Sequence, residues 1–290
     1  MELPEYFLHS LILARWTLGV RGRGGCGVPL TPPHGVLWMA LDLAKTAGSV
    51  LLFQALFWLS HLFCSHPLSP VAYKYTRLSA ADRNVWCQFV CSFVKGVAVC
   101  CLCYPVAWRN AEALRMTDSF DGVLDQSEMQ LPLYLFMGYA ISDTVSIASY
   151  FQRGKGDTAL IIHHLATASI WCYILALDFA YNLACIACLV EFTTPLLAIR
   201  WFMASSRLKT HPLYVFNGLM ILVGWWVLRI GLYVGFFSWR LQYLVARGLS
   251  SREGPVLLAW LVGAVLQVFW GQKLTVGFIK VVKTALKKTD

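Results

Sequence analysis

Seven long apolar segments constrain the fold of this chain more strongly than any other feature of its sequence. They cover residues 36–62, 84–106, 131–151, 158–178, 181–203, 213–237 and 255–280. About 20 apolar residues in a helix are enough to cross the hydrocarbon core of a bilayer. Backbone groups at that depth need partners within the segment, which a helix provides. The sequence therefore predicts an all-α, multi-pass transmembrane helical bundle of about seven spans.

The composition agrees with a membrane protein. Charged residues make up 13% of the chain, whereas soluble domains have roughly 25%. The net charge of +9 comes from basic residues in short loops beside the spans, so we do not expect nucleic acid as a partner. Glu2, Glu5 and Arg15 make the N-terminus unlike a signal peptide. We expect residues 3–18 to lie along the membrane surface and residues 21–33, rich in Gly and Pro, to be flexible.

The loop charges predict the orientation of the chain. With a lumenal N-terminus, the cytosolic segments hold twelve basic and three acidic residues, and the lumenal segments hold eight basic and nine acidic residues. Basic residues favour the cytosolic side, so the C-terminus is predicted to be cytosolic. The basic loop from Arg240 to Arg252 fits this arrangement poorly.

The last four residues support an endoplasmic reticulum location. Lys287 and Lys288, the fourth and third residues from the end, match the dilysine retrieval signal, which coat machinery reads as an address. The alternative interpretation is that these lysines bind anionic lipid together with Lys280 and Lys283.

Several spans carry polar side chains that are costly in a bilayer. Ionisable residues at this depth are functional-site hypotheses by default. We expect them to meet in one lipid-accessible cavity reached from the cytoplasm. The alternative is that they only hydrogen-bond the helices together. The set comprises Lys95, Asp143, His163, His164, Glu191, Asn217 and Arg229.

His163 and His164 are the strongest candidates for chemistry. Neighbouring residues of a helix point about 100° apart, so we expect one imidazole to face the cavity and the other an adjacent helix. A neutral histidine oriented by a carboxylate is a suitable general base. Asp143 or Glu191 would supply that carboxylate. Trp225 and Trp226 fit either an aromatic belt or the wall of an acyl-chain pocket.

Eight of the ten cysteines fall inside apolar spans. A cysteine in such a place packs as a small, soft hydrophobe. Cys185 and Cys188 have the spacing of a metal or redox pair. With no second pair expected nearby, we interpret them as helix-packing residues and predict no metal site.

The spans carry an ordered set of short motifs: Gly138-Tyr139-Ala140-Ile141-Ser142-Asp143, His163-His164-Leu165, Leu189-Val190-Glu191-Phe192-Thr193-Thr194-Pro195, Arg200-Trp201, Phe216-Asn217-Gly218 and Leu228-Arg229-Ile230. This set resembles the TLC domain family, which includes the ceramide synthases and the translocating-chain-associated membrane proteins. The similarity covers roughly residues 73–283 and is strongest to the TLC domain-containing protein 4 type. We therefore expect four regions: 1–35, an interfacial and flexible segment; 36–72, the first span and its loop; 73–283, the TLC domain; and 284–290, a cytosolic tail with a dilysine-like signal.

The resemblance implies a six-helix bundle around a lipid cavity in an endoplasmic-type membrane protein. In ceramide synthases the histidine pair is implicated in transferring an acyl group from acyl-CoA to a sphingoid amine. Carried over, His163 and His164 become base or acyl-relay residues, with Asp143 as their orienting partner. No cofactor is implied beyond acyl-CoA as a co-substrate. Glu191, Lys95, Asn217, Arg229, Trp225 and Trp226 are the expected lipid-binding or cavity residues.

Two departures weaken the ceramide synthase interpretation. The region after the histidines reads Cys188-Leu189-Val190-Glu191-Phe192-Thr193-Thr194, without the His-Asp of that group. Related branches often have histidine where this chain has Lys95, which would be an amine nucleophile or a neutralising partner of Glu191 or Asp143. We therefore predict a lipid-binding protein that influences membrane lipid composition. The alternatives are a lipid N-acyltransferase and a proton-coupled transporter.

Overall fold

The computed structural model describes residues 35–116, 124, 126–149 and 157–286 of the chain. The predicted surface segment 3–18, the flexible tract 21–33 and the dilysine Lys287-Lys288 lie outside the described residues. The chain divides into two compact units, Met1–Leu41 and Asp42–Asp290. All of the contacts described below belong to the second unit.

The described residues form helices and no strands. The long helices are α2 (Gly35–Ser65), α4 (Ala80–Arg109), α6 (Gln126–Ser149), α7 (Asp157–Leu177) and α12 (Glu253–Leu286). Two further spans are built from several pieces, and the short helices α3 (Ala72–Tyr75) and α5 (Ala111–Met116) flank α4. Within the described ranges, seven stretches are long and apolar enough to cross a membrane. The predicted multi-pass helical bundle is therefore confirmed.

The fifth span changes helix type at Glu191. It consists of α8 (Tyr181–Leu189), a 3₁₀ turn η1 (Val190–Phe192) and α9 (Thr193–Ser205). Pro195 has no N–H, so it cannot donate the hydrogen bond that the carbonyl of Glu191, four residues earlier, would receive in an α-helix. A tighter 3₁₀ turn at this place accommodates the missing bond. Pro195 thus helps to set the position of the only carboxylate in this span.

The sixth span also changes type in its middle. It consists of α10 (Pro212–Gly224), the π-helix η2 (Trp225–Val234) and α11 (Gly235–Arg247). Pro212 begins it, and Nδ1 of the N-cap residue His211 accepts a hydrogen bond from the Leu213 N–H at 3.2 Å. Wide π turns are frequent at functional sites. This one carries Trp225, Arg229 and Tyr233 on its buried face.

The sixth helix is longer than predicted, which corrects the assignment of Arg240. The sequence interpretation ended the span at residue 237 and counted Arg240 as a lumenal loop charge. In the structure, α11 continues to Arg247, and Arg240 is 1% exposed with its guanidinium over the rings of Phe236 and Trp239. Arg240 is therefore not a loop charge, which reduces the conflict between this loop and the predicted orientation.

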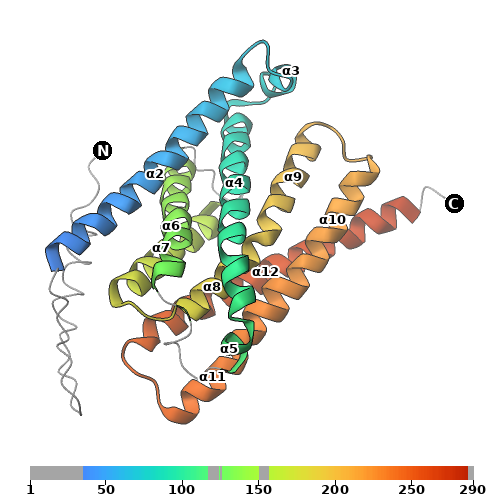
Figure 1. The fold of residues 1–290 in the computed structure, drawn as a ribbon. Helices are drawn as coiled ribbons and strands as arrows, with labels where there is room; N and C mark the ends of the chain where they lie inside the picture. The colour runs from blue at the N-terminus through green and yellow to red at the C-terminus, as the bar shows by residue number, and fades with distance from the viewer. Residues whose placement is uncertain (1–34, 117–123, 125, 150–156, 287–290) are drawn as a thin grey trace. The chain divides into compact units, whose positions relative to one another are not determined.

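Helix α4 lies at the centre of the described bundle, against α6, α8 and α9 (Figure 1). Its N-terminus is capped by Ser79, whose hydroxyl accepts a hydrogen bond from the Asp82 N–H at 3.1 Å. Small residues allow close helix approach: a Cβ on Gly96 would meet Pro195 Cδ at 2.8 Å, and one on Gly138 would overlap Ser49 of α2. Such small residues are typical of membrane helix interfaces.

Candidate functional site

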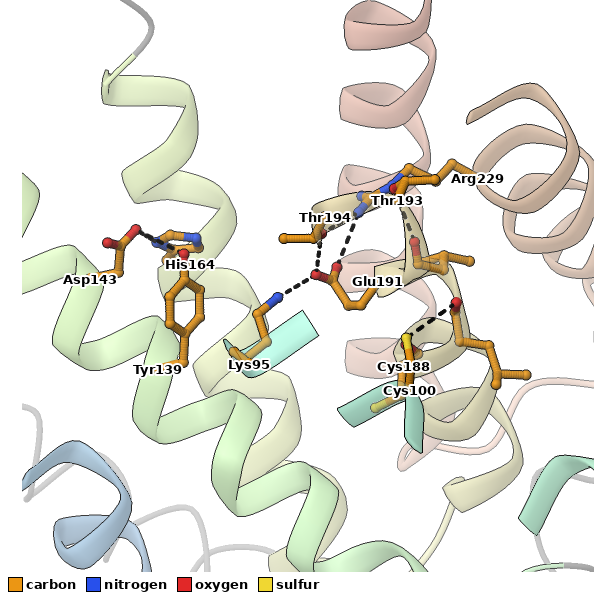
Figure 2. Close-up of polar contacts among 12 residues, drawn as sticks. Lys95, Cys100, Tyr139, Asp143, His164, Cys188, Glu191, Thr193, Thr194 and Arg229 are labelled. Carbon is orange, nitrogen blue, oxygen red and sulfur yellow. Dashed lines mark hydrogen bonds and ion pairs between the residues drawn. The ribbon is translucent and has the colours of Figure 1, made fainter. Parts of the chain in front are cut away.

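Glu191 is the centre of a buried ion cluster. Its Oε2 forms an ion pair with Lys95 Nζ of α4 and accepts a hydrogen bond from Thr194 Oγ1 at 2.7 Å. Its Oε1 lies 3.3 Å from Arg229 Nη2 of the π-helix η2. Figure 2 shows the lysine and the arginine approaching the carboxylate from two different helices. The three side chains are 3–6% exposed.

Arg229 uses its whole guanidinium group in this cluster. Nε donates to Thr193 Oγ1 at 2.7 Å, Nη1 to Gln267 Oε1 at 3.2 Å and Nη2 to Thr194 Oγ1 at 3.1 Å. Its charge also lies 4.5 Å from the ring centre of Trp225. These contacts offset the cost of placing the charge in a membrane helix. The cluster ties η2 to η1, α9 and α12.

Lys95 is held by a carboxylate and two aromatic rings. The lysine pairs with Glu191, and its ammonium lies over the rings of Phe136 at 4.3 Å and Tyr139 at 4.8 Å. Of the two roles considered for it, neutralising partner and free amine nucleophile, the geometry favours the first. The cluster contains two cations and one anion. The faces of the neighbouring aromatic rings stabilise the additional positive charge.

Asp143 and His164 form a second buried pair. His164 Nδ1 lies 3.4 Å from Asp143 Oδ2, and the Tyr139 hydroxyl donates to the same oxygen at 3.4 Å (Figure 2). The two side chains are 5% and 6% exposed. The rings of Tyr139 and His164 meet edge-on at 5.6 Å. Asp143 of α6 therefore pairs with His164 rather than with His163.

His163 points elsewhere and lines a narrow cavity. Its ring meets that of Trp270 of α12 edge-on at 5.5 Å, and it has no hydrogen-bonding partner among the described residues. The cavity volume is about 60 Å³. The walls come from four parts of the chain: α7 (His163, Ala166, Thr167, Ile170, Trp171 and Ile174), α6 and α8–η1 (Phe136, Leu183, Ala187, Val190 and Glu191), η2 (Tyr233), and α12 (Val256, Ala259, Trp260, Val262, Gly263, Leu266 and Gln267).

The cavity is elongated, with one polar end. Helices α7 and α12 run antiparallel along it, since His163 meets Trp270 and the Tyr173 hydroxyl donates to the Arg252 carbonyl at 3.1 Å. The lining residues of each helix cover eleven steps, or about 16 Å at 1.5 Å per residue. His163, Glu191 and Gln267 lie at one end, and Ile174 and Val256 at the other.

The structure brings together some of the predicted residues and separates others. His163 and Glu191 line the cavity, and Lys95 and Arg229 lie behind Glu191. Asp143 and His164 pair with each other and do not line it. Asn217 is 7% exposed and lies outside the lining. The division between the two histidines follows the 100° turn between them.

The two tryptophans serve different helix contacts. Trp225 Nε1 donates to the Gln267 carbonyl at 3.0 Å, and Trp226, 44% exposed, donates to Thr275 Oγ1 at 3.1 Å. Neither lines the cavity. Sequence reasoning missed Gln267, the neutral polar residue that lies in the middle of the last span and joins the cavity to the ion cluster. The signal in the sequence was a side-chain amide within an apolar span.

The cysteine interpretation needs one correction. A second pair does lie near Cys185 and Cys188: Cys185 Sγ is 3.9 Å from the Cys103 carbonyl, and Cys100 Sγ is 3.7 Å from the Cys188 carbonyl. The sequence did not indicate this contact, because the two cysteine pairs are far apart in the chain, one on α4 and one on α8. Within the described part of the chain, no group of three or more His, Cys, Asp or Glu residues is arranged to hold a metal ion.

Comparison with known proteins finds relatives that match most of the chain. TLC domain-containing protein 4-B of Danio rerio is 25% identical over 253 residues, which cover 85% of this chain and 92% of that protein. TLC domain-containing protein 4-B of Xenopus laevis is 26% identical over 255 residues, covering 83% and 91%. The family profile of the TLC domain matches residues 85–276, which include the ion cluster, both histidines and Gln267. The chain belongs to the TLC domain family.

Proposed function

We propose that this membrane protein binds a lipid in the cavity between α7 and α12 and thereby influences membrane lipid composition. One observation carries the proposal: a narrow cavity among membrane-spanning helices is apolar along most of its length and polar at one end. Ligand sites of this kind combine apolar walls with a few polar groups that fix orientation. A lipid has the same division between chain and headgroup.

The polar groups of the cavity have unused hydrogen-bonding capacity. No hydrogen bond among the described residues involves the Gln267 Nε2, the Thr167 hydroxyl or the Tyr233 hydroxyl, although all three residues line the cavity. The Trp171 Nε1 is buried and has no hydrogen-bond partner in the described part of the chain. Buried polar groups without partners cost free energy. A ligand with an acceptor oxygen at the polar end would satisfy the Gln267 Nε2 and Thr167 hydroxyl donors.

The cavity must widen to take a lipid. Its volume of about 60 Å³ is well below the 300–1,000 Å³ of drug-sized ligand sites. On the faces of α7 and α12 turned away from the cavity, Leu165, Leu261 and Val265 are 48%, 49% and 61% exposed. Such apolar residues on a membrane helix suit contact with lipid. We infer that a chain enters between α7 and α12 from the bilayer as the side chains that line the cavity move apart.

Mass spectrometry of lipid bound to the purified protein tests the proposal. Ala259 lines the cavity, so Ala259→Leu should fill it and reduce the lipid that co-purifies with the protein. Ala55→Leu makes the same change at an exposed position of α2 and should leave the bound lipid unchanged. Lipid profiles of cells expressing each variant in place of the normal protein should change for Ala259→Leu alone.

Either of two results would refute lipid binding in this cavity. The wild-type protein would carry no lipid above the amount adhering to an unrelated membrane protein in the same detergent. Equal loading of the Ala259→Leu and Ala55→Leu variants, both folded, would show that any bound lipid lies elsewhere.

A second candidate function, acyl-CoA-dependent N-acylation of a lipid amine, has one observation in its favour. The His163 imidazole has no hydrogen-bonding partner and faces the same cavity. It would accept the proton of an amine whose nitrogen attacks the thioester carbonyl. A C–N bond then forms, the C–S bond breaks, and the thiolate leaves and takes up a proton. General base catalysis of this kind needs a neutral histidine within reach of the amine.

Labelled acyl-CoA and a sphingoid amine, supplied to the purified protein, distinguish the two functions. Acyl transfer that disappears in both His163→Ala and His164→Ala supports the enzyme. Transfer that survives both substitutions, or is absent from a wild-type protein loaded with lipid, leaves lipid binding as the function.

A further inference from the structure

The aromatic residues Tyr233 and Trp260 form a stacked pair in the wall of the cavity. The two rings stack in parallel, 4.1 Å between centroids and 8° between planes, and both residues line the cavity. They are 9% and 5% exposed. Trp260 lies seven residues before Gln267 on α12, about 10 Å along the helix axis at 1.5 Å per residue. The stack therefore lies beyond the polar end, toward Val256.

Gly263 holds this pair in place. A Cβ on Gly263 would overlap the Tyr233 hydroxyl, so the absence of a side chain there gives the tyrosine its position. Gly263 also lines the cavity. Tyr233 itself comes from the π-helix η2, one helical turn beyond Arg229. The glycine and the π-helix together place an aromatic ring in the wall of the cavity.

The shape of the cavity limits what can occupy it. The lining residues extend over about 16 Å of α7 and α12, and a volume of about 60 Å³ is small for that extent. A slender, flexible hydrocarbon chain can adapt to it by displacing side chains locally. A rigid fused-ring lipid or a pair of chains would need the helices to separate along the whole length, which close-packed interiors resist.

We propose that the cavity takes one unbranched hydrocarbon chain, with its oxygen-bearing end at His163 and Gln267, and that the stacked Tyr233–Trp260 pair sets how long that chain can be. This inference rests on the proposed lipid-binding function and adds the class of ligand and the residues that select it. Beyond Trp260 the lining of α12 continues four residues to Val256, about 6 Å. Removing the indole should open that length to the chain.

Native mass spectrometry of the full chain in detergent tests the proposal, with a ladder of saturated fatty acids from lauric to behenic as the probe. The wild-type protein should retain acids up to a limiting length. Trp260→Ala should shift the retained acids to longer chains, by up to about the 6 Å of newly opened helix length. Gly263→Ala, which displaces the Tyr233 ring into the remaining space, should shift them to shorter chains. These two variants change the limit in opposite directions, so misfolding of one leaves the other informative.

Trp108→Ala is the matched control, because Trp108 is 72% exposed on α4. It should retain the wild-type distribution. A wild-type protein that retains acids, with the same distribution in both the Trp260→Ala and Gly263→Ala variants, refutes the role of the aromatic pair and leaves lipid binding intact. A wild-type protein that retains none of the probes and carries no co-purified lipid refutes the proposed function itself, and this inference with it.

Discussion

Lys95 and Glu191, 96 positions apart in the sequence, form an ion pair inside the helical bundle. Arg229 completes the cluster from the opposite side of the carboxylate. A single acid thus joins α4, the 3₁₀ turn η1 and the π-helix η2. Because all three side chains are almost fully buried, none of them can exchange its partner for water when one is removed.

Glu191→Gln should destabilise the protein strongly. It leaves two cations without their carboxylate, and breaking a buried ion pair in this way costs about 3–5 kcal/mol. The midpoint of thermal unfolding in detergent is the measurement. Glu112→Gln, at an exposed position of α5, should change the free energy of unfolding by no more than about 0.5 kcal/mol.

The double variant Lys95→Met, Glu191→Gln removes one positive and one negative charge together. It should unfold at a higher temperature than Glu191→Gln alone, because only Arg229 then remains charged and it keeps its contacts with Thr193 and Gln267. Strictly additive losses from the two substitutions would show that the pair contributes no coupling and would contradict this account of the cluster.

Asp143→Asn and His164→Gln should have coupled effects on stability. The two side chains lie 3.4 Å apart and are buried, and residues in contact show interaction free energies of roughly 0.5–3 kcal/mol in double-mutant cycles. A cycle of thermal unfolding measurements gives the value. His164→Gln combined with Glu112→Gln serves as the comparison, and its two effects should add to within about 0.5 kcal/mol.

Gly138→Ala should destabilise the contact between α2 and α6. The new methyl group would overlap Ser49 and its backbone, and overpacking of this kind typically costs about 1–3 kcal/mol. Gly48→Ala, one residue from Ser49, meets nothing within 4 Å. It should be neutral or stabilising by up to about 1 kcal/mol, since alanine favours a helix over glycine. Equal unfolding temperatures for the two variants would contradict this packing.

Tyr75→Phe should weaken the junction of α2, α3 and α4. The Tyr75 hydroxyl lies 2.7 Å from His61 Nδ1 and 3.4 Å from Cys87 Sγ, and the residue is fully buried. Removing one partner of a buried hydrogen bond costs about 1–3 kcal/mol. Tyr73→Phe on the same short helix, at a position 67% exposed, should have little effect on the unfolding temperature.

The same tyrosine should also affect stability in alkali. Burial raises the pKa of the Tyr75 hydroxyl above its ordinary value of 10.0. A group whose pKa is raised on folding contributes stability that is present below its unfolded pKa and is lost as the pH rises above it. Loss of stability above pH 10 should therefore be smaller in Tyr75→Phe than in Tyr73→Phe. Parallel alkaline unfolding curves for these two variants would count against the buried hydroxyl.

Much of the architecture could be predicted from the chain alone. The length and apolarity of the seven spans determine the helical bundle, because a bilayer leaves the backbone few other choices. The pairing of Lys95 with a carboxylate was anticipated as one alternative. The split between His163 and His164 follows from helix geometry, although only the structure shows which of them faces the cavity.

Other features depend on contacts that sequence spacing does not reveal. Cys103 and Cys185 are 82 positions apart, so only the packing of α4 on α8 brings the two cysteine pairs together. Arg240 was assigned to a loop, whereas ring faces and neighbouring groups keep it inside a helix. Gln267 is neutral, and a neutral amide interrupts hydropathy too weakly to mark a site.

The π-helix of the sixth span has a consequence for register. Each π turn holds one residue more than an α turn, so deleting a single residue between Trp225 and Val234 would let part of this stretch relax to ordinary helical winding. That relaxation would offset most of the rotation of about 100° that one deleted residue causes in an ordinary α-helix, so α10 and α11 would keep their relative orientation. A deletion between Arg229 and Tyr233 would instead shorten the spacing of these two residues, and they could not both keep their contacts with Glu191 and Trp260. In this segment the number of residues therefore matters as much as their identity.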